Sequence, residues 1–394
     1  MTANTPSLPP ARAGLLVLGI LLIASNLRAP VTSVAPVLDL IRADFAFSAT
    51  AAGLLTTLPL LAFAALSPLA GPLARRCGLE RTLLLSLLAL IAGLLIRSAG
   101  AEWALFAGTL LIGAAIAIGN VLLPSLLKRD FPDRIASLTS AYVLVMGIAA
   151  GLGSVLAVPL AQWSSGWALS LLFPVVLALA GLLAWLPQWQ RHTAPVPAAA
   201  TAVQETPLWR NALAWQVTLF LGLNSLVYYV VVGWLPSMLR DAGLPPATAG
   251  SMHGLLQVAS ALPGLLLVPV IRRLHDQRLL AVATSTLSTV GLLGLLLAPH
   301  WSVLWTLMYG MGAGATIILG LAFVSLRACS VRQAAALSGM AQAVGYLLAA
   351  AGPMLVGLLR DLSGGWTVTL LLCMLVSLLQ AASGFLAGRN IQLD

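Results

Sequence analysis

Apolar runs of about twenty residues recur along the whole chain, and no other feature limits its fold as strongly. The segment "TLLLSLLALIAGLLI" (82–96) is typical, because it is continuous and shows no alternation at period two. Such a run can cross a bilayer core of roughly 30 Å as a helix, whereas a barrel strand needs about ten alternating residues. Hydrophobic residues occupy 60% of the 394 positions and charged residues 8%, which excludes an ordinary soluble domain. The sequence predicts an all-α integral membrane protein.

Twelve spans are expected, and a long polar connection rich in Pro and Ala divides them into two sets of six. We expect an N-terminal six-helix bundle in residues 1–187, a flexible cytoplasmic linker in 188–208, and a C-terminal six-helix bundle in 209–394. The expected spans are roughly 13–38, 49–73, 80–99, 103–127, 135–160, 166–187, 209–238, 247–271, 279–298, 301–326, 334–359 and 366–387.

Most of the basic residues lie in the loops on one side of the expected membrane spans. With the N-terminus in the cytoplasm, fifteen Lys and Arg residues face inside, four (Arg42, Arg97, Arg240 and Arg360) face outside, and Arg28 is left within a span. This bias predicts a multi-pass protein of the bacterial cytoplasmic membrane with both termini cytoplasmic. The net charge of +9 is therefore interpreted as a topology signal, and no nucleic-acid partner is expected.

The two halves repeat. The motif "PLARRCGLER" aligns with "PVIRRLHDQR" at an offset of 197, which matches Pro72, Arg75, Arg76 and Arg81 to Pro269, Arg272, Arg273 and Arg278. A second match pairs residues 164–167 with residues 363–366, each segment preceding the last span of its half. Since each half has an even number of spans, we expect two bundles related by a pseudo-twofold axis along the membrane normal.

This organisation resembles the major facilitator superfamily, and three motifs are more specific. "NLRAPVTSVAPVL" (26–38), "GNVLLPSLLKRDFPDR" (119–134) and "VVGWLPSMLRDAG" (231–243) together resemble the cyanate and nitroimidazole transporter family. The resemblance implies the major facilitator fold and transport of small molecules such as cyanate or nitroimidazole. It also marks basic loop motifs as gating candidates: Arg75, Arg76, Arg81, Arg272, Arg273, Arg278, Lys128, Arg129 and Asp130. Arg75 replaces the usual acidic residue after Gly71, which argues against a charge-relay gate built on that position.

Arg28 is the polar residue that most needs an explanation. An unpaired arginine at mid-membrane costs about 2.5 to 3.5 kcal/mol on insertion scales, so such residues usually face a cavity. Two interpretations remain open: Arg28 binds an anion or an electron-rich group, or it has a structural role, in which it extends toward Asp39 or Asp44 near the end of the span or ties helix ends together. The resemblance implies that spans one, four, seven and ten line the central path. The candidate substrate ligands in spans one, four and seven are Arg28, Asn26, Asn120, Asn224 and Tyr228. Spans five, eight and eleven add Tyr142, Gln257, Gln342 and Tyr346.

Energy coupling is left open by the sequence, because no acidic residue lies at a span centre. Transport could be passive, an exchange of anions, or coupled to protons through His253 or a surface carboxylate such as Asp39. His253 is the coupling candidate because it is the only histidine placed inside a span.

The favoured function is a secondary transporter for a small anion or polar planar compound. A membrane-embedded enzyme is disfavoured because no paired carboxylates, metal set or activated nucleophile is recognised at membrane depth. A ligand sensor or scaffold without transport is the alternative, although no soluble domain accompanies the spans. We expect the protein to bind a small-molecule substrate that is anionic or contains a nitro group, and to bind no metal or cofactor. We also expect it to lie in a lipid bilayer as a monomer.

Overall fold

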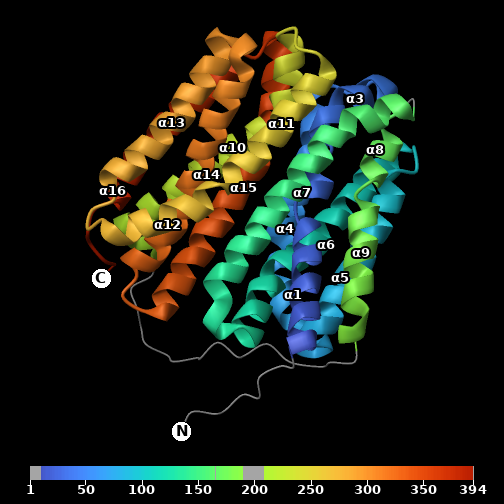
Figure 1. Ribbon diagram of the computed structural model, residues 1–394. Helices are drawn as coiled ribbons and strands as arrows, with labels where there is room; N and C mark the ends of the chain where they lie inside the picture. Colours follow the sequence, from blue (N-terminus) through green and yellow to red (C-terminus); the bar gives the residue numbers. More distant parts are fainter. Residues whose placement is uncertain (1–9, 165, 190–207, 394) are drawn as a thin grey trace.

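The computed structural model describes residues 10–164, 166–189 and 208–393 as a bundle of helices (Figure 1). The N-terminal half contains α1 (Pro10–Ser25), α2 (Ala29–Thr32), η1 (Ala35–Val37), α3 (Leu38–Phe45), α4 (Ala49–Cys77), α5 (Leu79–Arg97), α6 (Glu102–Asp130), η2 (Pro132–Arg134), α7 (Ile135–Trp163), α8 (Ala168–Leu172), α9 (Val175–Trp185) and η3 (Leu186–Gln188). The C-terminal half contains η4 (Leu208–Arg210), α10 (Ala212–Asp241), α11 (Pro246–Ala261), α12 (Pro263–Arg273), α13 (Arg278–Leu297), η5 (Pro299–Trp301), α14 (Ser302–Arg327), α15 (Val331–Ser363) and α16 (Thr367–Ala387).

The prediction of twelve membrane helices is confirmed: twelve helical segments in the described residues are long and apolar enough to span a bilayer. Three of them are interrupted. The first span, Gly14–Phe45, consists of α1, α2, η1 and α3, the sixth of α8 and α9, and the eighth of α11 and α12. A proline lies at or beside each interruption, as expected for a residue without a backbone N–H: Pro30, Pro36, Pro174 and Pro263. The predicted linker 188–208 lies almost entirely outside the described residues.

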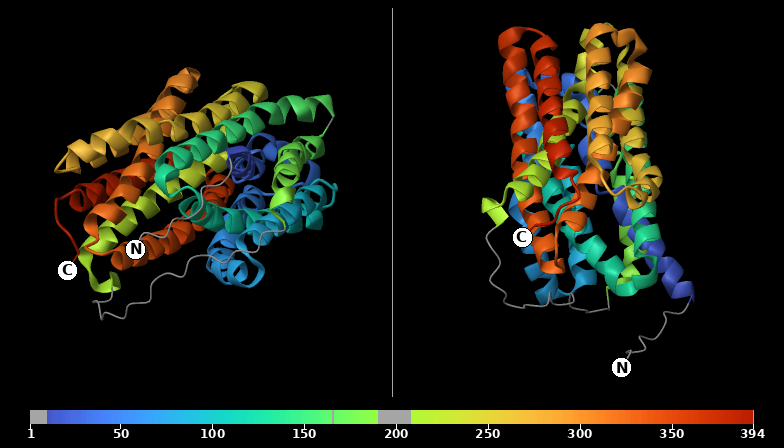
Figure 2. Two further views of the ribbon diagram at one scale, coloured as in Figure 1. Left: turned by 60° about the horizontal axis from the view of Figure 1, so that its bottom comes forward. Right: turned by 90° about the vertical axis from the view of Figure 1, so that its left-hand side faces the viewer.

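The helices form two bundles that pack side by side (Figures 1 and 2). One hydrophobic cluster contains residues from both halves, such as Leu38 of α3 and Trp234 of α10, and it lies toward the upper end of Figure 1. Toward the lower end, where α1 begins and α16 ends, one cluster lies mainly in the N-terminal half, with Leu16 of α1, but also includes Ala349 and Ala350 of α15. A third cluster, with Phe323 of α14, lies within the C-terminal half. The bundles therefore share a large core at the upper end and also meet through α15 below it.

The internal repeat is visible as a pair of matching contacts. The Trp167 indole donates to Asp44 at 2.9 Å in the N-terminal half, and the Trp366 indole donates to Asp241 at 2.8 Å in the C-terminal half. Asp44 and Asp241 are separated by 197 residues, the same offset as the basic loop motifs. Each pair fastens the start of the last span of a half to the end of its first span.

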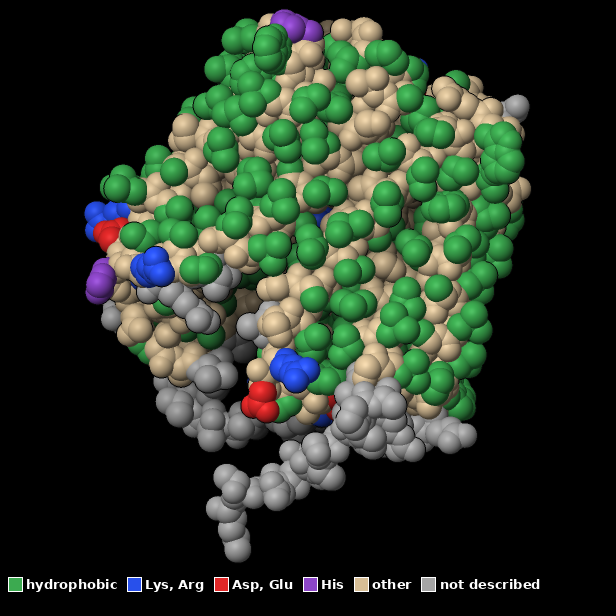
Figure 3. Space-filling view, viewed as in Figure 1, with side chains coloured by type: hydrophobic (Ala, Val, Ile, Leu, Met, Phe, Trp, Pro, Cys, Tyr) green, Lys and Arg blue, Asp and Glu red, His purple; other side chains and the backbone are tan. Residues whose placement is uncertain are grey.

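The outer surface suits a lipid environment. In Figure 3, uncharged and hydrophobic side chains cover the broad middle of the molecule, while charged side chains gather near the lower end and one margin. On α16, for example, Leu371, Leu375 and Leu379 are each more than half exposed. Exposed leucines in such number are stabilised by acyl chains rather than by water.

Candidate functional site at the bundle interface

Arg28 lies at the first break of the first span. Helix α1 ends at Ser25, and Arg28 is the N-terminal cap residue of α2, with φ −135° and ψ −43°. Pro30 has no N–H to donate to the carbonyl of residue 26, which favours an interruption here. The break leaves a guanidinium group midway along a membrane span.

The Arg28 side chain contacts the opposite bundle. Its Cζ atom lies 5.1 Å from the centroid of the Tyr228 ring on α10, within the range of a cation–π interaction. Tyr229 packs edge-to-face against Tyr228, with 5.6 Å between ring centroids. Tyr346 of α15 packs edge-to-face on Phe63 of α4, with 6.0 Å between ring centroids, and so also lies between the bundles. An aromatic ring of the C-terminal bundle therefore contacts a cation of the N-terminal bundle, and further aromatic rings lie along the interface.

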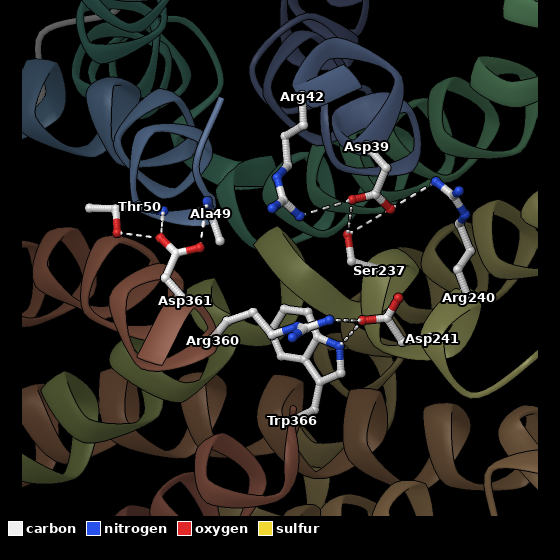
Figure 4. Close-up of polar contacts among 10 residues, drawn as sticks. All are labelled: Asp39, Arg42, Ala49, Thr50, Ser237, Arg240, Asp241, Arg360, Asp361 and Trp366. Atoms are coloured by element: carbon white, nitrogen blue, oxygen red, sulfur yellow. Dashed lines mark hydrogen bonds and ion pairs between the residues drawn. The ribbon is translucent and has the colours of Figure 1, made fainter. Parts of the chain in front are cut away.

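The two carboxylates nearest to Arg28 along its span, Asp39 and Asp44, are engaged elsewhere, and Figure 4 shows the contacts of Asp39. Asp39 accepts from Arg240 at 2.8 Å and from Ser237 at 3.1 Å, both on α10, and Arg42 lies 3.6 Å away. Asp44 accepts from an indole of its own bundle. Within the described parts of the chain, no carboxylate pairs with Arg28. The alternative in which Arg28 extends toward Asp39 or Asp44 is therefore not what the structure contains.

A row of polar side chains leads from Tyr228 to a buried histidine. The Tyr228 hydroxyl donates to Gln257 Oε1 at 3.0 Å, and Gln257 Nε2 lies 3.4 Å from His253 Nε2. His253 is fully buried: its Nε2 lies 2.8 Å from the Val232 carbonyl, and its Nδ1 lies 2.9 Å from Ser154 Oγ on α7. The row thus joins α10 and α11 of one bundle to α7 of the other.

A second polar contact closes the upper end of the interface (Figure 4). Asp361, near the end of α15, accepts from the backbone N–H groups of Ala49 and Thr50 at 3.0 and 2.9 Å, and from the Thr50 hydroxyl at 2.8 Å. It therefore caps the first turn of α4 from the opposite bundle, where exposed N–H groups favour a negative charge. Lower down, the Thr57 hydroxyl donates to the Ala350 carbonyl at 3.0 Å.

Close helix packing accompanies these contacts. A Cβ atom added at Gly357 of α15 would lie 2.3 Å from the Ala49 carbonyl oxygen, and one added at Gly53 of α4 would lie 2.5 Å from the Pro353 carbonyl oxygen. Only glycine allows α4 and α15 to approach this closely at the upper end.

The other predicted ligands occupy three kinds of position. Asn26 is buried inside the N-terminal bundle, where its amide donates to Leu22 at 2.7 Å, and Asn224 donates to the Ala313 carbonyl on α14 at 3.3 Å. Gln342 is exposed and donates to Ser338 on its own helix. Asn120 on α6 and Tyr142 on α7 are half-buried and, like Gln342, lie toward the lower ends of their helices. The structure therefore groups Arg28, Tyr228 and Gln257, places Tyr346 against Phe63 of the opposite bundle, and keeps the amide contacts of Asn26 and Asn224 within single bundles.

The basic loop residues differ in their contacts. Arg129 pairs with Asp130 at 2.7 Å and with buried Glu80 at 2.8 Å, which ties α6 to α5. Arg81 lies over the Trp189 ring, and Arg278 pairs with Asp276 at 3.2 Å. Arg75, Arg76, Lys128 and Arg273 are exposed, while the side chain of Arg272 lies outside the described residues.

Two arginines at the ends of expected spans are buried. Arg97, expected at the outer end of its span, is 0% exposed and donates to the carbonyls of Pro30 at 2.6 Å and Leu171 at 2.9 Å. Arg327, expected at the inner end of its span, is 2% exposed and donates to the Ala387 carbonyl at 2.9 Å. The sequence gives no sign of this burial, because the carbonyl groups that accept from these side chains come from broken helices and helix ends far along the chain.

Twelve membrane helices in two bundles, with a polar and aromatic cluster between them, define a transporter of the alternating-bundle class. The comparisons agree. The family profile of the Major Facilitator Superfamily matches residues 16–353, and the chain belongs to this superfamily.

Relatives and solved structures refine this assignment. The chain is 51% identical to the 2-nitroimidazole transporter of Escherichia coli (strain K12), over 99% of each protein. It is 29% identical to the cyanate transport protein CynX of the same organism, over 89% of this chain and 91% of that protein. Its fold is similar to that of a bacterial homologue of the human lysosomal transporter Spinster in an inward-facing conformation, with TM-score 0.74, 17% identity and 98% of each chain covered. The predicted family resemblance is confirmed, and the protein is a multi-pass bacterial secondary transporter of small molecules, not an enzyme.

Proposed function

We propose that the protein carries a small anion, or a small planar compound with an electron-rich group, across the cytoplasmic membrane, with Arg28 as the main substrate ligand. One observation carries the proposal: Arg28 contacts Tyr228 across the bundle interface, while Asp39 and Asp44 are paired with other groups. A guanidinium group offers a flat fork of donors, and an aromatic ring offers a face for stacking. Cyanate is a small anion and 2-nitroimidazole a planar ring with a nitro group, so both fit this chemistry.

The remaining ligands are assigned by their positions. Tyr228, Tyr229, Tyr346 and Gln257 complete the proposed site around Arg28. Asn120, Tyr142 and Gln342 are proposed to line the path between that site and the lower end of the molecule. Asn26 and Asn224 are now assigned to packing, because their amides bond to backbone carbonyls within their own bundles.

Alternating access is proposed to proceed by opening of the upper end. With both termini in the cytoplasm, the upper end is the outer side, and the Asp39–Arg240 and Asp361–Thr50 contacts form an outer latch between the bundles. The described conformation is then closed on the outside. Breaking the latch would let the bundles rock about the Arg28 site and expose it to the other side.

His253 is proposed as the group that couples transport to protons. Its Nε2 must donate, because its partner is the Val232 carbonyl. In the neutral ring, Nδ1 accepts from the Ser154 hydroxyl; in the charged ring, Nδ1 donates, and that hydroxyl donates to the Ala150 carbonyl, 2.8 Å away. Rotation of one hydroxyl therefore satisfies either protonation state, which suits a site that gains and loses a proton.

The substrate assignment is tested by uptake of labelled cyanate and 2-nitroimidazole into proteoliposomes. Losing a charge-assisted hydrogen bond, worth about 1.5 to 3 kcal/mol, should raise the KM of Arg28→Ala about 10- to 100-fold, and Arg28→Lys should fall between it and the parent. Arg210→Ala is the matched control, since Arg210 also lies over a ring, 5.0 Å from Trp209, but on the exposed surface. Equal uptake by Arg28→Ala and the parent would remove Arg28 from the site. Binding without uptake would favour the sensor alternative.

A further inference from the structure

Arg97 is the buried cation that the transport proposal leaves unused. It is the last residue of α5, and its two terminal nitrogens donate to different elements: one to the Pro30 carbonyl in α2, the other to the Leu171 carbonyl in α8. Both acceptors lie beside interruptions of membrane helices. Within the described residues no carboxylate pairs with Arg97, so burying its charge is offset by these carbonyl groups.

The segment that Arg97 holds carries Arg28. Helix α2 has only four residues, and its cap residue makes no side-chain capping bond, so local hydrogen bonding fixes its direction weakly. Tertiary contacts must therefore set that direction. Arg97 bonds to the Pro30 carbonyl at 2.6 Å, and the Ser33 hydroxyl donates to the same oxygen at 3.3 Å. Pro30 is two residues from Arg28, well within the same turn of chain.

We propose that Arg97 is a positioning residue for the substrate site: by joining the Pro30 and Leu171 carbonyls, it fixes the direction of α2 and therefore the place of the Arg28 guanidinium against Tyr228. The inference rests on the proposed role of Arg28. A displacement of about 1 Å in a binding group can cost two orders of magnitude in function, so a group that controls the helix break controls the site.

The substitution Arg97→Lys separates geometry from charge. Lysine keeps the positive charge but presents one nitrogen instead of a planar fork, so it cannot reproduce both carbonyl bonds in the same directions. Ser33→Ala is a milder second variant, because it removes only the weaker donor to the Pro30 carbonyl. Arg327→Lys is the matched control, since Arg327 is equally buried, donates to the Ala387 and Gly388 carbonyls, and lies at the lower end of the other bundle.

The test measures KM and Vmax for 2-nitroimidazole uptake in proteoliposomes, for each variant in the parent and in the Arg28→Ala background. We expect Arg97→Lys to raise KM about tenfold with Vmax changed less than about twofold, Ser33→Ala to raise it about two- to threefold, and Arg327→Lys to leave it within about twofold. In the Arg28→Ala background, Arg97→Lys should change KM by less than about twofold, because the group that it positions is absent.

The outcomes are distinguishable. An unchanged KM in folded Arg97→Lys, or the same rise in both backgrounds, overturns the positioning role while leaving Arg28 as a ligand. If Arg97→Lys fails to insert, an unchanged KM in Ser33→Ala overturns the role. If Arg28→Ala itself has the parent's KM, the proposed site falls, and the role of Arg97 falls with it.

Discussion

Replacing Asp39 with asparagine should open the outer end of the transporter. Asp39 accepts from Arg240 at 2.8 Å and from Ser237 at 3.1 Å across the bundle interface, and all of these contacts are lost when the bundles separate. Its contact with Arg42 lies within one helix, so we expect it to contribute equally to both conformations and not to the difference between them. Asparagine keeps the shape and an acceptor oxygen but removes the charge.

The magnitude follows from burial. The side chains of Arg240 and Asp39 are 32% and 22% exposed, so the pair lies between a fully solvated one, worth about 0 to 1 kcal/mol, and a buried charged hydrogen bond, worth about 1.5 to 3 kcal/mol. An intermediate cost of about 1.4 kcal/mol shifts the ratio of outward-open to outward-closed molecules about tenfold toward the open form.

Spin-label distances measure that ratio directly. Nitroxides at Ala43 and Ala242, both exposed at the upper end, report the separation of the bundles once the free cysteines Cys77, Cys329 and Cys373 are replaced. Asp276→Asn is the matched control, because the Asp276–Arg278 pair lies within one bundle. An Asp39→Asn protein with the parent's distance distribution would refute the latch, as would an equal shift in the control.

Three further outcomes are expected. Gly357→Ala should favour the outward-open form at least as strongly as Asp39→Asn, because the new Cβ atom would lie 2.3 Å from the Ala49 carbonyl oxygen. The same spin-label pair measures this shift. Gly339→Ala is the control, because a Cβ atom at Gly339 would have nothing within 4 Å. Asp361→Asn should weaken the cap on α4 and add to the effect of Asp39→Asn in the double variant, which distance distributions also measure. His253→Gln should abolish any stimulation of uptake by an imposed pH gradient while retaining uptake down a substrate gradient; a parent that ignores the gradient, or a variant that still responds to it, would exclude His253 as the coupling group.

The membrane architecture was predictable because it depends on segment length and hydropathy. Twelve spans, two bundles and the family follow from continuous apolar runs, basic loops and motifs such as 26–38, all of which are properties of the chain read locally. The break near Pro30 also follows from a local rule, the missing N–H of proline. Arg28 could be identified from the sequence for a similar reason. A positive charge within an apolar span has a free-energy cost in the membrane that does not depend on which helices the span contacts.

Contacts between distant residues were not predictable in the same way. Asp39 and Arg240 are separated by 201 positions, and neither segment contains a sequence pattern that indicates its contact with the other. Arg97 was assigned only to the outer end of an expected span, and its burial was not predictable because the carbonyls that accept from it come from α2 and α8. Asn26 and Asn224 were grouped with Arg28 by depth alone, and depth does not say which side of a helix faces the interface.

The arginines that pair with carboxylates and Arg28 have different proposed roles: the former stabilise an arrangement of helices, and Arg28 determines selectivity. Arg240 and Arg360 each contact a carboxylate at 2.8 Å, so their charges stabilise a particular arrangement of helices. Arg28 contacts the face of Tyr228, and a cation–π interaction of about 0.5 to 2 kcal/mol recovers only part of the roughly 2.5 to 3.5 kcal/mol that a mid-membrane arginine costs. Under the proposed role of Arg28, a cargo that brings electron density to this side chain would supply the missing stabilisation and gain affinity from it. An uncharged, apolar compound of the same shape supplies none, and the site should therefore discriminate by electron density more strongly than by size.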